Sequence, residues 1–196
     1  RLMNNGLITL TRTEEDNKRG QMYTQQRKRK EFEETVSDLS QFLEQLNIKV
    51  KIEDSNEFLI PRISQLTLKT NQFNLTTKRY QEEDIQKFTL DNNFIVGCAN
   101  VRDKFGDNGI TGVFIIKKND KIWNLDTFLL SCRVMGRGVE NLILSHLLQE
   151  AKKNGIKEFI AEFIPTEKNK PSSNFLKENG FIKRENYWVF DLEKNI

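Results

Sequence analysis

The chain is poor in the residues that build metal sites and disulfide frameworks. Among its 196 residues there are two cysteines and one histidine. Cys98 and Cys132 each stand in an apolar run and lack the short spacing of zinc ligands. Two isolated thiols make no disulfide framework, which favours a reducing compartment. We therefore predict a cytoplasmic protein with no metal in this segment.

Long apolar runs and a strong charge of one sign are also missing. No apolar run approaches the roughly 20 residues that a membrane span needs, and no basic leader precedes an apolar stretch and a cleavage site. The 31 basic and 28 acidic residues leave a net charge of +3. This mild balance does not indicate nucleic acid, although it suits a local anionic ligand. Neither a membrane nor a nucleic acid is expected as a partner.

Residues 1–46 have the pattern of helices. Thr13-Glu14-Glu15-Asp16 is typical of a helix start. The basic run 27–30 stands three and four residues from the acids at 31–34, the spacing of surface pairs. We interpret this run as a solvated helix face, with phosphate contact as the alternative. Because the chain opens with Arg1 rather than Met, we expect a helical extension that belongs to a longer protein.

Residues 47–196 alternate between strand and helix patterns. The patterns predict strands at 48–52, 94–101, 109–116, 122–130 and 157–164, a final strand pair or bent strand at 181–192, and helices at 58–68, 81–90, 138–154 and 172–179. Tight-turn residues at 106–109 and 118–121 indicate an antiparallel meander. A right-handed crossover through the long helix would make the strands around it parallel. We predict an α/β (α+β) fold with a mixed, mostly antiparallel sheet flanked by helices.

One turn between a strand and a helix has the features of an anion site. The segment Arg133-Val134-Met135-Gly136-Arg137-Gly138, here called the glycine loop, joins strand 122–130 to the long helix. Two glycines let the backbone approach a ligand closely. The first N–H groups of the helix are free, and its N-terminus carries a partial positive charge. With two arginines beside them, these groups are suited to a phosphate.

The pattern Arg-x-x-Gly-x-Gly resembles the motif of the GNAT acyltransferase superfamily, and the resemblance covers residues 47–192. In that superfamily the motif supports the pyrophosphate of coenzyme A. The pantetheine arm lies between two splayed strands, which correspond to 122–130 and 157–164. The resemblance implies coenzyme A or an acyl-carrier phosphopantetheine as cofactor, bound by Arg133, Val134, Gly136, Arg137, Gly138 and Asn169. Leu176 stands where many members carry the tyrosine that protonates the leaving thiolate.

Three longer blocks resemble FkbH-like proteins of the haloacid dehalogenase (HAD) superfamily, subfamily IIIC. They are residues 65–77, 102–109 and 129–140. Such proteins join an N-terminal phosphatase-like domain to a C-terminal GNAT-like domain. The resemblance implies a partner role for that HAD-like domain and for an acyl carrier protein, onto which a glyceryl-derived, methoxymalonyl-type acyl unit is loaded or transferred. Residues 1–35 resemble only the tail of the phosphatase half, so this fragment should lack phosphatase activity.

Three residues are candidates for acyl-transfer chemistry. Cys132 could hold an acyl group, since a nearby helix N-terminus favours the thiolate; the alternative is a buried, unreactive side chain. Asp126 and Glu162 lie on the two strands expected to splay, where a carboxylate could act as a general base. Either could instead pair with a nearby Lys or Arg.

Several polar residues near the predicted site have plainer alternatives. Asn71, Gln72 and Asn74 could hydrogen-bond an acyl group or a pantetheine amide, or could simply end a helix. His146 shares the spacing of apolar residues, so we predict a core histidine. Glu140 would repel a bound phosphate, and its side chain is expected to point away from the glycine loop. We therefore predict an acyltransferase-type domain, with a non-catalytic carrier-docking module or a small-molecule N-acetyltransferase as alternatives.

Overall fold

The computed structural model describes residues 14–36 and 39–194, and the predicted helix cap at Thr13 lies outside them. The chain divides into two compact units. The first contains the described residues up to Asn47 together with Lys104–Gly106, and the second contains Ile48–Asp103 and the residues from Asp107 onward.

The first unit consists of two helices and a short turn. Helix α1 (Glu14–Thr35) is followed by α2 (Leu39–Leu46). The ring of Phe32 contacts those of Phe42 and Phe105, and Lys104 Nζ lies 3.2 Å from the centre of the Phe32 ring. Most of the basic run is exposed, as predicted, but Arg29 is buried. This unit forms the predicted helical extension.

The second unit is built on a twisted mixed sheet. Its elements are β1 (Lys49–Asp54), α3 (Ile60–Lys69), β2 (Phe73–Asn74), α4 (Glu82–Leu90), β3 (Phe94–Asp103), β4 (Gly106–Lys118), β5 (Ile122–Leu130), α5 (Val139–Lys153), β6 (Glu158–Ala161), α6 (Phe175–Glu178), β7 (Ile182–Arg184) and β8 (Tyr187–Asp191). The strand order is β1-β3-β4-β5-β6-β8-β7, and β2 pairs with β5. Strands β5 and β6 are parallel, whereas β1–β3, β4–β5, β6–β8 and β7–β8 are antiparallel. The predicted fold class is confirmed.

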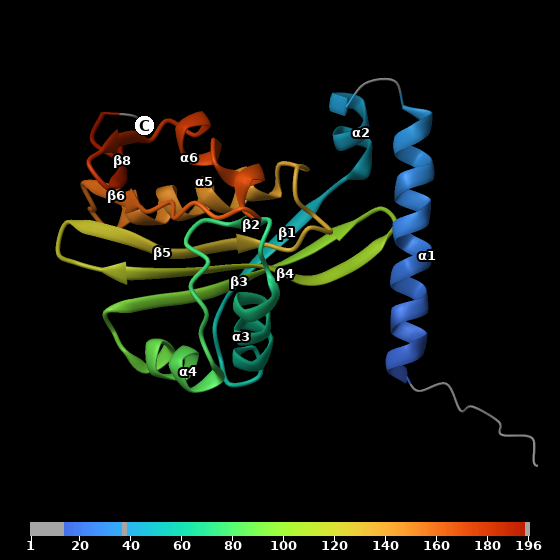
Figure 1. Cartoon of the computed structure of the whole chain (residues 1–196), viewed down its shortest axis with the longest axis horizontal. Coiled ribbons are helices and arrows are strands. Elements are labelled where there is room, and N and C mark those ends of the chain that lie inside the picture. Colours follow the sequence, from blue (N-terminus) through green and yellow to red (C-terminus); the bar gives the residue numbers. More distant parts are fainter. Residues whose placement is uncertain (1–13, 37–38, 195–196) are drawn as a thin grey trace, which may run out of the picture. The chain divides into compact units, whose positions relative to one another are not determined.

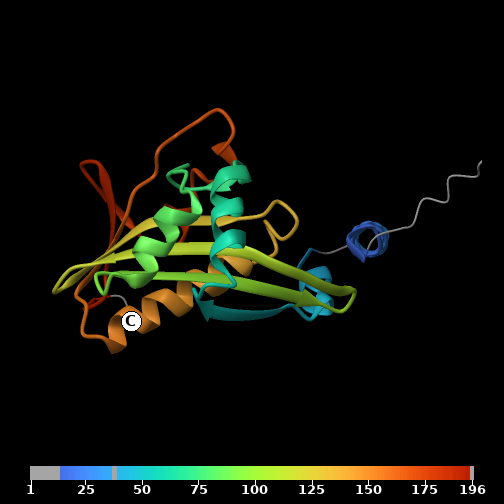
Figure 2. The ribbon, with the colours of Figure 1, turned by 90° about the horizontal axis from the view of Figure 1, so that it is seen from below.

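Helices cover both faces of this sheet (Figures 1 and 2). Helices α5 and α6 lie on one face, over a core that includes Phe114, Leu125 and Phe128. Helices α3 and α4 lie on the opposite face, over a smaller core with Ile63 and Ile85. Strand residues therefore alternate between two apolar layers, which explains the continuous apolar runs 113–116 in β4 and 128–130 in β5.

Two predicted boundaries are wrong for identifiable reasons. The predicted turn at 106–109 lies within β4, and the connection to β3 is instead at residues 104–105. The polar side chain of Asn108 is buried and donates to Asp103 Oδ2 at 3.3 Å, so it serves the interior of the hairpin. Strand β6 ends at Ala161 rather than 164, because β5 bends away from it at that point.

We predict that Gly97→Ala destabilises the protein. A Cβ at Gly97 would collide with the ring of Phe114, which is 2% exposed and cannot move aside. Overpacking of this kind costs about 1–3 kcal/mol, and urea unfolding measures it. In a Phe114→Leu background the added cost of Gly97→Ala should largely disappear. An equal cost in both backgrounds would contradict the predicted clash.

Candidate functional site

The site begins at an irregularity in β5. Ile115 of β4 pairs with Thr127, and Ile116 pairs with Leu125, so Asp126 has no partner in β4. This is a β-bulge, which bends a strand and increases its twist. The parallel pairing of β5 with β6 ends at Leu125, immediately before the bulge. The bulge therefore opens the gap between two neighbouring strands that the superfamily resemblance implies.

A segment of the chain itself lies in this gap. Residues 73–76, here called the inner segment, run along the edge of β5 that β6 has left. Phe73 pairs with Leu130, and Asn74 pairs with Leu129. The sequence patterns did not predict strand β2, because a strand of two residues has no measurable alternation.

The glycine loop connects β5 to the N-terminus of α5, as predicted. Gly136 and Gly138 have φ angles of 75° and 77°, the left-handed region that glycine adopts without strain. A Cβ at either position would meet only open space. Val134 is fully buried beneath the loop, and its backbone N–H donates to Ser131 O at 3.1 Å. It therefore supports the loop from the core, and its N–H is already bonded within the protein.

Glu140 lies against the glycine loop, contrary to the prediction that it points away. Its Oε1 accepts a hydrogen bond from the Gly136 N–H at 3.1 Å. Within the described part of the chain, its buried Oε2 atom has no hydrogen-bond partner. Burial raises the pKa of this carboxyl above its ordinary value. The Gly136 N–H, which was predicted to bind a phosphate, thus donates to a carboxylate of the protein itself. The first turn of α5 brings the side chain of Glu140 back onto the loop.

Arg137 extends from the glycine loop towards the protein interior. Its Nη1 lies 3.9 Å from Oδ2 of Asp103, whose side chain is 1% exposed. A buried carboxylate of this kind needs a nearby cation. The predicted cofactor role of Arg137 stays a prediction, and the structure gives the residue this ion pair.

A pocket of about 750 Å³ opens beside the start of the glycine loop, here called the basic pocket. Its walls come from α3, from residues 69–72, from residues 131–133 and from the turn before α6. Four cationic side chains line it: Arg62, Lys69, Arg133 and Lys168. Cys132 is exposed on its wall, so the alternative of a buried, unreactive thiol is wrong.

Arg62 was missed by the sequence analysis and is held in a fixed position. Its Nε and Nη2 donate to the Ile110 carbonyl at 3.3 and 3.0 Å, and Nη1 donates to Gln65. Burial and the positive charge of Arg133 lower the pKa of Arg62 from its usual value. No spacing in the sequence could have found this pair, because the two arginines are 71 positions apart and meet only in the fold.

Asp126 is engaged by three donors. Its carboxylate accepts from Lys78 Nζ at 2.6 Å, from the Tyr80 hydroxyl at 2.8 Å and from Thr127 Oγ1 at 2.9 Å. Burial and the bond to Asp126 raise the pKa of Tyr80 above its ordinary value. The ion pair with Lys78 is the alternative that the sequence left open for Asp126. Glu162 is half-buried and directly follows β6.

The predicted amide residues divide into two groups. Asn71 and Gln72 line the basic pocket, where Asn71 Oδ1 accepts from Arg79 at 2.5 Å. Asn74 and Asn169 are fully buried. Asn74 bonds Thr70 O and the Thr77 N–H, so its amide has a structural role.

Asn169 is a structural clamp. Its Nδ2 donates to Asn74 O and to Ile164 O, both at 2.9 Å, and its Oδ1 accepts from the Thr166 N–H at 2.7 Å. With both amide hydrogens and the amide oxygen bonded inside the protein, the residue is ill suited to the predicted cofactor contact.

Two further predictions concern helix side chains. The prediction that His146 belongs to the core is wrong, since the residue is exposed. The buried residues of α5 centre on Ile143, Leu147 and Ala151, and His146 lies about 100° around the helix axis from Leu147, at the edge of that stripe. Leu176 is buried in α6, and the described residues that line the basic pocket include no tyrosine.

The described residues contain no cluster of His, Cys, Asp and Glu suited to a metal. Among the helices that the structure describes, none combines the length and the apolar character of a membrane span.

Comparison with known proteins relates this architecture to acetyltransferases. No protein-family model and no curated protein matches the sequence. The structure is similar to a GNAT-family acetyltransferase from Staphylococcus aureus Mu50, with a TM-score of 0.56 and 14% identity over 74% of this chain and 99% of that one. The GNAT domain of PAT from S. lividans gives a TM-score of 0.55 and 17% identity over 72% of this chain and 90% of that one. A Mycobacterium tuberculosis protein solved in complex with CoA gives a TM-score of 0.53 and 15% identity over 69% of this chain and 73% of that one.

At these identities the likeness establishes the fold: the chain has the GNAT fold. The two halves of the implied coenzyme A site fit that ligand differently. The outer half offers open space beside Gly136 and Gly138 and the guanidinium groups of the basic pocket. The inner half, between β5 and β6, does not fit the pantetheine arm, because residues 73–76 lie there.

We predict that Glu140→Gln stabilises the protein above neutral pH. The folded pKa of Glu140 is raised, so the folded state binds this proton more tightly than the unfolded state. Stability then falls as pH rises from the unfolded pKa, about 4.3, through the folded pKa. Glutamine keeps the acceptor for Gly136 and removes the charge. In urea unfolding, the free energy of unfolding of Glu140→Gln should exceed that of the unmodified protein by the full amount at pH 8, and the difference should vanish near pH 4.

The exposed Glu178→Gln is the matched control, with no change expected at either pH. A Glu140→Gln effect that is equal at pH 4 and pH 8 would show that the buried charge is not its cause.

Proposed function

We propose that the domain from Ile48 onward is an acyltransferase-type domain that recognises the anionic end of an acyl carrier in the basic pocket. The carrier is coenzyme A or the phosphopantetheine of an acyl carrier protein. The pocket's four cationic side chains suit phosphate or carboxylate groups. Two similar structures were solved with coenzyme A, which supports this class of ligand.

The observation that carries the proposal is that Arg62 and Arg133 line the same pocket and that their positive charges repel each other. Like charges are brought together at a cost, and an anionic ligand between them removes the repulsion. Arg62 is already anchored on Ile110, so little side-chain freedom is lost when a ligand binds. Arg133 also begins the glycine loop, so the same ligand can extend towards Gly136.

The resemblance of residues 65–77, 102–109 and 129–140 to FkbH-like proteins supports a more specific role. In this proposal the domain acts beside an N-terminal HAD-like phosphatase domain in the cytoplasm. It helps to load or transfer a glyceryl-derived acyl unit, of the methoxymalonyl type, on an acyl carrier protein. Residues 14–194 by themselves are proposed to have no phosphatase activity.

Two chemical roles are compatible with this binding function. Exposure of the Cys132 thiol on the pocket wall favours acyl holding. The acyl carbon would form a bond to Cys132 Sγ and break its bond to the carrier sulfur, which leaves as a thiol with the proton from Cys132. The engagement of Asp126 by Lys78 and Tyr80, and Leu176 in place of tyrosine, favour a non-catalytic docking module instead.

We predict that Arg133→Gln weakens binding of coenzyme A, measured by titration calorimetry, by at least about tenfold. Gly136→Asp should weaken it as well, because it adds a second carboxylate next to Glu140. Raised salt should reduce the affinity, since the contacts are ionic.

The control for Gly136→Asp is Gly155→Asp, which introduces the same charge. Gly155 also has a left-handed φ, 68°, and open space around it, but it lies beyond the opposite end of α5. Equal effects of both substitutions would contradict a role of the glycine loop. Affinity for the holo carrier protein without any affinity for coenzyme A would exclude the N-acetyltransferase alternative.

We further predict that Cys132 is acylated when the protein is incubated with an acyl thioester. Intact-mass spectrometry should show one acyl adduct, absent in Cys132→Ser. Cys98 is an internal control, because it is fully buried and burial raises the pKa of its thiol to about 11. Carrier binding without any adduct would favour the docking module.

A further inference from the structure

We propose that residues 73–76 are a permanent occupant of the gap between β5 and β6, so that a carrier's pantetheine arm stays outside the sheet. The resemblance to GNAT proteins places that arm in the gap. In this chain the inner segment fills the gap with protein backbone and side chains.

The inner segment is bonded along the whole length of β5 beyond the bulge. After the paired residues Phe73 and Asn74, the Leu75 N–H donates to Phe128 O at 3.1 Å. Thr76 Oγ1 donates to the carbonyl of Asp126, the bulge residue, at 2.9 Å. The backbone acceptors that β6 leaves free are thus already bonded.

The opposite wall of the gap is bonded to the same segment. The Ile164 N–H donates to Leu75 O at 2.8 Å, so Leu75 bridges both walls through its own backbone. Asn169 fixes the bridge by donating to Asn74 O and Ile164 O. A ligand in the gap would have to break bonds on both sides at once.

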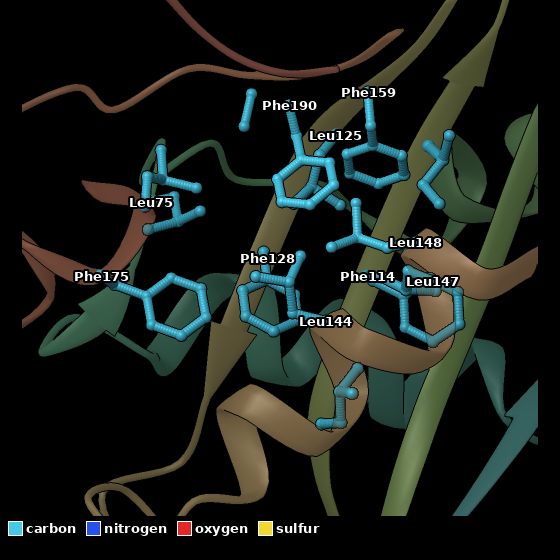
Figure 3. Packing of buried hydrophobic residues seen from close by; sticks show 14 of the residues in the cluster. Leu75, Phe114, Leu125, Phe128, Leu144, Leu147, Leu148, Phe159, Phe175 and Phe190 are labelled. Atoms are coloured by element: carbon cyan, nitrogen blue, oxygen red, sulfur yellow. The ribbon is translucent and has the colours of Figure 1, made fainter. Parts of the chain in front are cut away.

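Side-chain burial seals the gap as well. The four residues of the inner segment are each at most 3% exposed. Phe73 packs against Phe128 and Phe175, with ring centres 5.8 and 5.0 Å apart. Leu75 belongs to the same core, beside Phe128 and Phe175 (Figure 3). Removal of this segment would expose the main core of the domain.

The consequence concerns which part of the carrier is recognised. If the arm is excluded from the sheet, affinity comes from the phosphates at the basic pocket, and carriers with different arms should bind alike. This consequence rests on the proposed function, whereas the occupied gap itself does not.

Amide hydrogen exchange of the free protein tests the occupied gap directly. The Leu75 and Ile164 amides should exchange slowly, and Asn169→Ala should accelerate both. Asn179→Ala, which removes bonds to Phe175 O and Asn141 elsewhere, is the matched control and should leave them slow. If Asn169→Ala does not fold, Thr76→Val removes the bond to Asp126 with nearly the same shape. Exchange of Leu75 in the unmodified protein at the rate of an unprotected amide would overturn the proposal.

Calorimetry with coenzyme A and with adenosine 3′-phosphate 5′-diphosphate, which lacks the arm, tests the consequence. The two dissociation constants should agree within about threefold, with Leu75 exchange unchanged at saturation. Coenzyme A binding more than tenfold tighter than the armless ligand, with altered Leu75 exchange, would overturn it. If neither ligand binds, the proposed function fails, and slow exchange at Leu75 and Ile164 still upholds the occupied gap.

Discussion

Because Asp126 is an extra residue in β5 with no partner in β4, the strand bends and leaves β6 after Leu125. The same extra residue shifts the alternation of side chains. Leu125 precedes the bulge and Phe128 lies three positions after Leu125, yet both face the core under α5. The bulge thus keeps the apolar face of β5 intact while it opens one edge of the strand. The inner segment, the glycine loop and the basic pocket all lie near that edge.

An open edge of a central strand in a protein interior must be bonded, because unpaired backbone groups away from water are costly. In this chain residues 73–76 supply those bonds, and Asn169 holds them from the far side. Glu140 satisfies a donor of the glycine loop in the same manner. Both contacts come from the protein's own residues at positions that the superfamily resemblance gives to a ligand. The basic pocket stays open beside these contacts.

Much of the architecture followed from local patterns. The bounds of β5 were predicted to the residue, and the crossover through α5 followed from the handedness of such connections. The glycine loop was located from two glycines between a strand and a helix. The turn of the β3–β4 hairpin was misplaced, because Asn108 is a turn former that here bonds a buried aspartate. His146 was misassigned, because its spacing fits an apolar stripe whose centre lies elsewhere.

The sequence by itself determined the fold class and the position of the glycine loop, because these depend on periodicity and on residues adjacent in the chain. Only the tertiary structure decided what each polar group does. The side chain of Asn169 donates to the backbone carbonyl of Asn74, 95 positions away, a contact that their places in the chain do not specify. Arg62 and Arg133 line one pocket for the same reason. Hydrogen bonds and charge pairs depend on distance in space, and the spacing of residues along a chain does not specify that distance.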